Sequence, residues 1–279
     1  MIRLLPSDSF LLPGRESSGL PMTRSETDPM RHLLILNPNT DTSLTQKLAV
    51  RARAQLPGNT SISSTTACLG ASYIACRASL AIAAHATLDA FAREYERNPA
   101  LAQPDTTVLI ACFGDPGLAA LQEITQCSVT GMAHASLQSC RNKGGRTGII
   151  TGGDAWKPLI EELVATTNFG PTIAGIRTLP ESGEHASKSL EKTVQALQEN
   201  ALDLIHHDHA DHILVAGAGL AGLDKVLSSR IPVPVYCSFA ESIAYIAASS
   251  FGHKVTKQAP LTTTGLSVPL SQFLQGPII

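Results

Sequence analysis

The chain has 279 residues, of which 43% are hydrophobic and 16% charged, and its formal net charge is −2. This composition is typical of a globular protein with a sizeable core, and it provides no basic surface for nucleic acid or an anionic membrane. No apolar run is long enough to cross a bilayer. The six cysteines lack CxxC spacing, which favours free thiols in a reducing, cytoplasmic compartment. We therefore expect a partner that is a small molecule.

Residues 1–30 are rich in Ser, Pro and mixed charge without periodicity, which predicts a disordered N-terminal extension. From residue 31, short apolar runs alternate with helical stretches, the pattern of an α/β protein. Strands are predicted at 32–36, 60–66, 106–112 and 128–132, and then, after Lys143-Gly144-Gly145, at 147–151, 172–179, 212–217 and 232–237. Helices are expected between them, the long ones at 71–96 and 184–207.

The second series of strands repeats the first. LLILNPNT (33–40) aligns with GIITGGD (148–154), and VLIACFGDPGL (108–118) aligns with ILVAGAGLAGL (213–223). The repeat predicts two doubly wound parallel-sheet domains related by a pseudo-twofold axis. We expect 31–127 with 233–255 to form the first domain and 128–232 the second, followed by a tail at 256–279. The apolar end of this tail suits either folding back onto the body or a contact in a homo-oligomer.

Ligands of parallel α/β sheets bind beyond the carboxyl ends of the strands. Four small, polar or Gly-rich turns follow such ends, at 37–40, 112–117, 151–154 and 217–222, and we expect them to line one cleft. The repeat places the thiol of Cys112 opposite the bare backbone of Gly217. The candidate substrate-binding residues in these turns are Asn37, Asn39, Thr40, Phe113, Gly114, Thr151, Gly217, Ala218 and Gly219.

Three segments together carry a resemblance to a known family. ILNPNT (35–40), ACFGDPGL (111–118) and AGAGLAGL (216–223) resemble the hydantoin racemase branch of the aspartate/glutamate racemase superfamily. The resemblance covers about residues 31–255. It implies two α/β domains and proton transfer at a carbon beside a carbonyl or carboxylate, with no metal and no other cofactor. Racemases of this family use two cysteines, one on each face of the substrate carbon, and Cys112 matches the first of them.

The sequence departs from the family pattern at three positions. Gly217 stands in the place of the second cysteine, His134 lies in a turn that usually carries an acid, and Cys237 replaces an acid at the end of the final strand. We expect Cys112 and His134 to be catalytic, while Cys237 is either a replacement base or a buried core thiol. Because only one thiol remains at the two family positions, a decarboxylase, lyase or biosynthetic cyclase stays open beside a racemase or epimerase. A non-catalytic ligand-binding relative is the third alternative.

The residues beside Cys112 bear on the direction of proton transfer. A cysteine is only a few per cent thiolate at neutral pH, so a base role needs a lowered pKa, whereas a proton-donor role does not. Asp115 suits the N-cap of the helix that follows it. The positive end of that helix would lower the pKa of the thiol, but the negative charge of Asp115 would raise it, and the sequence leaves the balance open.

Two other motifs invite different functions. The spacing Gly217-x-Gly219-x-x-Gly222 satisfies the dinucleotide-binding fingerprint, but only one clear strand follows it, and no acid ends that strand. The run from His206 to His212 has metal-binding residue types. It also lies at the end of a predicted helix, where imidazoles commonly serve as C-terminal caps. We therefore expect neither a dinucleotide nor a metal site.

Overall fold

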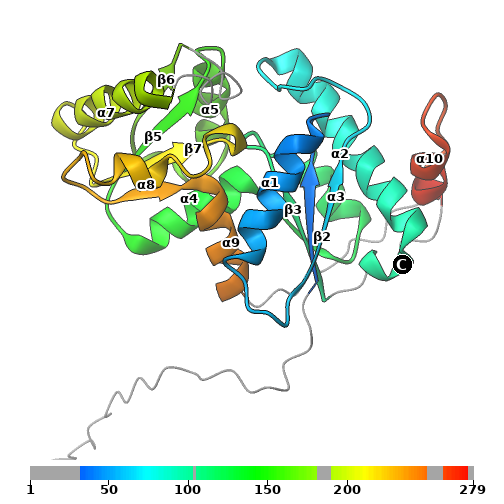
Figure 1. Cartoon of the computed structure of the whole chain (residues 1–279). Helices are drawn as coiled ribbons and strands as arrows, with labels where there is room; N and C mark the ends of the chain where they lie inside the picture. The colour runs from blue at the N-terminus through cyan, green and yellow to red at the C-terminus, as the bar shows by residue number, and fades with distance from the viewer. Residues whose placement is uncertain (1–31, 103–104, 181–189, 250–259, 276–279) are drawn as a thin grey trace, which may run out of the picture.

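The computed structural model describes residues 32–102, 105–180, 190–249 and 260–275. The chain forms two four-stranded parallel sheets, as the repeat predicts (Figure 1). The first contains β1 (His32–Asn37), β2 (Ser61–Thr66), β3 (Thr106–Ile110) and β4 (Ser128–Gly131) in the order β2-β1-β3-β4. The second contains β5 (Thr147–Gly152), β6 (Ile173–Leu179), β7 (His212–Ala216) and β8 (Val235–Cys237) in the equivalent order β6-β5-β7-β8.

The central strands are buried because helices cover their sheets. All five residues of β3 and all five of β7 are buried, as expected for the continuous apolar runs of parallel sheets. In the first half the helices are α1 (Thr42–Arg53), α2 (Arg77–Arg97), α3 (Leu118–Ile124) and α4 (Met132–Lys143), with the 3₁₀ turn η1 at Pro99–Ala102. In the second half they are α5 (Trp156–Thr166), α7 (Leu190–His206), α8 (Asp224–Leu227) and α9 (Ser238–Ala248), with η2 at Gly170–Thr172 and η3 at Ala218–Leu220.

Helices α4 and α9 join the two halves. Helix α4 carries the chain from β4 to β5, and α9 follows β8 and packs against α4. The buried Ser242 hydroxyl donates to the carbonyl of Met132 at 3.1 Å. At the other end, the ammonium of Lys143 lies 2.7 Å from the carboxylate of Glu241. The interface between the halves is therefore held by both buried and charged contacts.

The strand pairing corrects the expected domain boundaries. The segment 128–131 was expected in the second domain, but β4 pairs with β3 in the first sheet. The segment from 233 was expected in the first domain, but β8 pairs with β7 in the second sheet. Each half therefore keeps all four of its own strands. The chain passes between the halves along α4, after the fourth strand rather than before it.

The described part of the C-terminal tail folds back onto the first half. Helix α10 (Val268–Gln275) packs on α2, and the ring of Phe273 lies edge-on to Phe91 at 5.5 Å and to Tyr95 at 5.1 Å. The Ser267 hydroxyl donates to the buried carboxylate of Asp89. The predicted extension at 1–30 and the start of the tail at 256–259 lie outside the described residues. None of the described helices combines the length and hydrophobicity that crossing a bilayer requires.

Candidate active site

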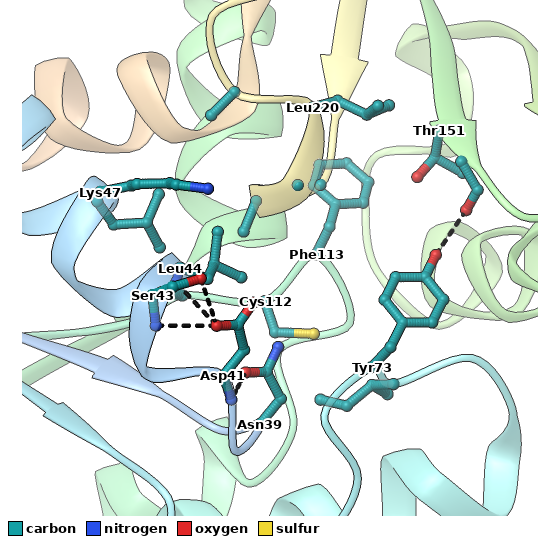
Figure 2. Close-up of a pocket in the computed structure, with 18 of the residues that line it drawn as sticks. Asn39, Asp41, Ser43, Leu44, Lys47, Tyr73, Cys112, Phe113, Thr151 and Leu220 are labelled. Atoms are coloured by element: carbon teal, nitrogen blue, oxygen red, sulfur yellow. Dashed lines mark hydrogen bonds between the residues drawn. The ribbon is translucent and has the colours of Figure 1, made fainter. Parts of the chain in front are cut away.

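A cavity of about 750 Å³ lies at the carboxyl ends of the two sheets (Figure 2). All four turns that the sequence predicted to line a cleft contribute to it: Asn39–Ser43 after β1, Cys112 and Phe113 after β3, Thr151 and Gly152 at the end of β5, and Gly217–Ala221 after β7. Helix α1 and the segment that leads into α2 complete the wall. The cavity is therefore shared between the two halves of the repeat.

Cys112 lies two residues beyond β3, and its thiol points into the cavity in Figure 2. Only 9% of its surface is exposed. Burial raises the pKa of the thiol to about 12, a hydrogen bond from the Gly114 N–H group opposes the shift, and the nearby charge of Asp115 adds to it. Burial is thus the main reason why this thiol holds its proton. A thiol with its pKa raised in this way is protonated at neutral pH, which suits a proton donor better than a resting base.

Asp115 does not cap the helix that follows it. Its two carboxylate oxygens accept the N–H groups of Ala133 at 2.8 Å and His134 at 2.7 Å, so it caps α4 across the sheet. Gly131 leaves room for this contact, because a Cβ there would lie 2.1 Å from the carboxyl carbon of Asp115. Burial raises the pKa of Asp115 to about 7, although the two N–H groups lower it. These two hydrogen bonds therefore connect the turn that carries Cys112 to the first residues of α4.

The two asparagines of the first turn have different roles: Asn37 stabilises the turn, and Asn39 lines the cavity. The buried Asn37 side chain donates to Asn39 Oδ1 at 2.7 Å, to the Asp41 carbonyl at 3.0 Å and to Thr45 Oγ1 at 2.9 Å. It shapes the turn and does not line the cavity. Asn39 and Thr40 do line it, at the entrance to α1. The sequence could not separate the two residues, because both occupy the same polar turn.

At Gly217, the residue that the repeat aligns with Cys112, the wall formed by the second half presents bare backbone. Gly217 has φ 103°, and a Cβ there would meet only Thr151 Oγ1, at 3.4 Å. The Thr151 hydroxyl donates to the Ala216 carbonyl at 3.0 Å, so it is already engaged. The N–H groups of Ala218 and Gly219 have no acceptor within the described residues. This wall can therefore donate hydrogen bonds to an anion but offers no side-chain base at Gly217.

Three further candidates lie outside the cavity lining. His134 is exposed, and its ring stands edge-on to Phe169 at 5.7 Å. Gly114 lies behind the turn, where a Cβ would come within 2.8 Å of Leu80. Cys237 is 5% exposed and packs in the core, where burial raises its pKa. The structure therefore brings neither His134 nor Cys237 to the cavity beside Cys112.

The cavity also has lining residues beyond the candidates given above. Lys47 and Arg51 reach the cavity from one face of α1, and Trp156 closes it from the start of α5. Tyr73 lines it as well and donates its hydroxyl to the Gly152 carbonyl at 3.0 Å, across the two halves. The i, i+4 spacing of the two cations was the available signal, but the face of α1 that meets the cavity depends on the fold.

The alternative motifs gain no support from the geometry. The glycine run after β7 leads into η3 and the four-residue α8, whereas a dinucleotide fingerprint opens a full helix. Within the described residues no three His, Cys, Asp or Glu side chains cluster as metal ligands. In the histidine run, His207 binds Asp203 at 2.7 Å and His212 binds Thr147 at 2.8 Å.

Comparison with known proteins agrees with this geometry. The model of the Asp/Glu/hydantoin racemase family matches residues 33–246. The hydantoin racemase of Paenarthrobacter aurescens is 30% identical over 218 residues, covering 76% of this chain and 90% of that relative. Allantoin racemase from Pseudomonas fluorescens superposes with a TM-score of 0.70 at 26% identity, over 77% of this chain and 88% of its own. A glycine-to-cysteine, cysteine-to-serine variant of arylmalonate decarboxylase shares the fold, with a TM-score of 0.58 at 15% identity over 81% of this chain and 96% of that chain.

Proposed function

Because this chain belongs to the Asp/Glu/hydantoin racemase family, we propose that it is an isomerase that moves a proton at the carbon beside a carbonyl of a small hydantoin- or amino-acid-like substrate. The observation that carries the proposal is the position of Cys112 at the end of β3, in a cavity shared by the two halves. The hydantoin and allantoin racemases to which the chain is similar favour a hydantoin ring. The free thiols fit a cytoplasmic enzyme, and this chemistry calls for no cofactor.

The backbone around the cavity suits the charge that such a reaction develops. When the proton leaves the substrate carbon, negative charge moves to the carbonyl oxygen, and hydrogen-bond donors aimed at that oxygen stabilise the enolate. The unpaired N–H groups of Ala218 and Gly219 and the amide of Asn39 are the donors that we assign to this role. Cys112 exchanges the proton on its face of the carbon, where general acid or base action contributes about 10²–10⁴-fold to the rate.

A single-thiol reaction is the second candidate, and Gly217 is the observation that favours it. Two-base racemisation needs a proton acceptor on one face and a donor on the other, but the wall at Gly217 has no side chain. A protonated Cys112, with its pKa of about 12, is ready to donate to an enolate made by loss of carbon dioxide or of another leaving group. A decarboxylase, lyase or cyclase would therefore need only the residues present. A pure ligand-binding relative would need no thiol at this position.

Proton exchange at the substrate carbon tests these alternatives. The native enzyme is incubated in D₂O with enantiopure hydantoins, amino acids and aryl-substituted malonates, and products are followed by NMR and chiral chromatography. Exchange with inversion that is lost in Cys112→Ala supports the racemase. Deuterated product of one handedness from malonates alone supports the decarboxylase. Absence of turnover, with ligand binding unchanged in Cys112→Ala, contradicts both and leaves the binding protein.

Restoring a second thiol separates the two catalytic alternatives. Gly217→Cys has room for its Cβ, but φ of 103° strains any side chain, so Gly217→Ala is the matched control for strain alone. If the native enzyme protonates from one face, inversion should appear in Gly217→Cys and be absent from Gly217→Ala. If the native enzyme already inverts its substrate, both variants should lose activity together, because the added thiol then supplies nothing new.

A further inference from the structure

Two cations on α1 line the cavity without a direct hydrogen-bond or ion-pair contact to the described part of the chain. Lys47 and Arg51 are one helical turn apart and both line it. Neither makes a hydrogen bond or ion pair with any residue that the structure describes. Figure 2 shows the Lys47 side chain extending from α1 toward the segment after β7 that carries Leu220. The charge of Lys47 acts on the nearby Asp41 carboxylate without a direct contact, so both cations keep hydrogen-bond donors for a ligand.

The one acid of the cavity wall does not neutralise this pair. Asp41 is the only aspartate or glutamate among the lining residues of the described chain. Its Oδ1 accepts the N–H groups of Ser43 at 2.9 Å and Leu44 at 3.1 Å and the Ser43 hydroxyl at 2.7 Å. The N-terminus of α1 therefore stabilises its charge. Two cations against one committed carboxylate leave the wall with an excess of positive charge.

Arg51 reaches from α1 to the opposite half. A Cβ on Gly222 would lie 2.6 Å from one terminal nitrogen of Arg51, so the guanidinium rests against the backbone of the segment after β7. The absence of a side chain at Gly222 leaves the guanidinium this place. Leu44, Leu48 and Leu220 line the same cavity. The cavity therefore combines the Cys112 thiol with apolar and cationic side chains.

We propose that Lys47 and Arg51 form an anion subsite that binds a carboxylate on the substituent of the substrate, while the reacting carbon lies against Cys112. The inference rests on the proposed function and narrows it: the preferred substrates are hydantoins whose C5 substituent carries an acidic end on a short apolar spacer. A guanidinium pairs with a planar carboxylate through two parallel hydrogen bonds, and an ammonium adds a point charge. The subsite selects for charge, and Cys112 carries out the proton transfer.

Binding to an inactive variant tests the subsite without turnover. In the Cys112→Ala background, calorimetry compares hydantoin-5-propionic acid with its carboxamide, which has the same shape and no charge. We expect the acid to bind about tenfold more tightly at low salt, equivalent to ~1.4 kcal/mol, and this preference should fall with added salt. Lys47→Met with Arg51→Met should abolish the preference. Lys47→Arg should retain it, because the positive charge remains.

Arg53→Met is the matched control, because Arg53 is exposed on the same helix and does not line the cavity. It should leave the acid-to-amide ratio unchanged, and thermal melting should confirm that all variants fold. Equal binding of acid and amide by the parent, or a preference that survives the double change, overturns the subsite. If no hydantoin binds, glutarate serves as the probe. Glutarate binding that is lost only in the Lys47 and Arg51 variants would support the subsite, although the proposed function would then have failed. Glutarate binding that is absent or insensitive to these changes overturns the subsite as well.

Discussion

Asp115→Ala should destabilise the protein well beyond the usual loss of a helix cap. The change removes the hydrogen bonds to the N–H groups of Ala133 and His134 and leaves the donor of the buried Ala133 without an acceptor. A lost cap costs about 1 kcal/mol, and an unsatisfied buried donor about 1–3 kcal/mol. Asp115 also has φ 45°, a conformation that alanine tolerates less well than aspartate. We expect a total loss of about 3 kcal/mol, or a fall in Tm of roughly 6–12 °C.

The pH dependence of this loss has a definite sign. Burial raises the pKa of Asp115 to about 7 in the folded protein, above the ordinary value of 3.8. The folded state therefore binds this proton more tightly than the unfolded state, and the contribution of Asp115 to stability declines as pH rises from about 4 to about 7. The difference in Tm between native and Asp115→Ala proteins should be larger at pH 5 than at pH 8.

Circular dichroism melts at the two pH values make the measurement, with Asp41→Ala as the matched control. Asp41 also accepts two helix N–H groups, but far less of the protein surrounds its carboxylate, so water can replace it. Its removal should cost only about 1 kcal/mol. Equal Tm losses for the two variants would refute the assignment of Asp115 as a buried clamp between the Cys112 turn and α4. A loss that grows from pH 5 to pH 8 would refute the direction of its pKa shift.

Three further predictions follow from the packing and the thiols. Gly131→Ala should lower the free energy of unfolding about as much as Asp115→Ala, because its Cβ would lie 2.1 Å from the Asp115 carboxyl carbon. In urea denaturation the double variant should lose less stability than the sum of the two single variants, and full additivity would contradict the clash. Iodoacetamide near pH 7 should label Cys76 before Cys112, because hydrogen bonds from Ser79 lower the pKa of the exposed Cys76 thiol while the pKa of Cys112 is about 12. Peptide mass spectrometry should show the labelling rate of Cys112 rising about tenfold per pH unit up to pH 10. A plateau of that rate near pH 8 would disprove the raised pKa. Phe273→Ala should lower stability by about 2 kcal/mol through loss of the ring contacts on α2, and an unchanged melt would show that the tail contributes nothing to the fold.

The architecture was accessible from the sequence because it repeats. Two series of apolar runs, each ending in a small polar turn, predicted two parallel sheets, and the structure confirms both of them in the same strand order. The domain boundaries were less accessible. Strands β4 and β8 are short, and nothing in their local pattern says which sheet they join. In the structure β4 pairs with β3 and β8 pairs with β7, so each strand stays with its own half of the repeat.

The cavity was predictable at the level of turns but not of side chains. The alignment that set Cys112 against Gly217 required only strand ends, and both residues do line one cavity. To place His134 correctly, one must know which face of α4 packs against the protein. That face buries Met132, Ala133 and Ser136, and His134 lies on the exposed side. The pKa of Cys112 depended on how deeply the fold buries it, a quantity that spacing does not contain.

The backbone at Gly217 constrains how this lineage can change. A single base change can turn a glycine codon into a cysteine codon, so the two-thiol arrangement looks close in mutational distance. A new side chain at Gly217 would have room, because its Cβ would make only an ordinary contact with Thr151. At φ 103°, however, the backbone conformation is strained for any residue other than glycine. The N–H group of Gly217 is also held by the Ser238 hydroxyl at 3.1 Å, which opposes a flip of that peptide. A cysteine introduced at this position would therefore begin from a strained backbone, and loop changes that relieve the strain should raise the stability of such a variant without altering its thiol.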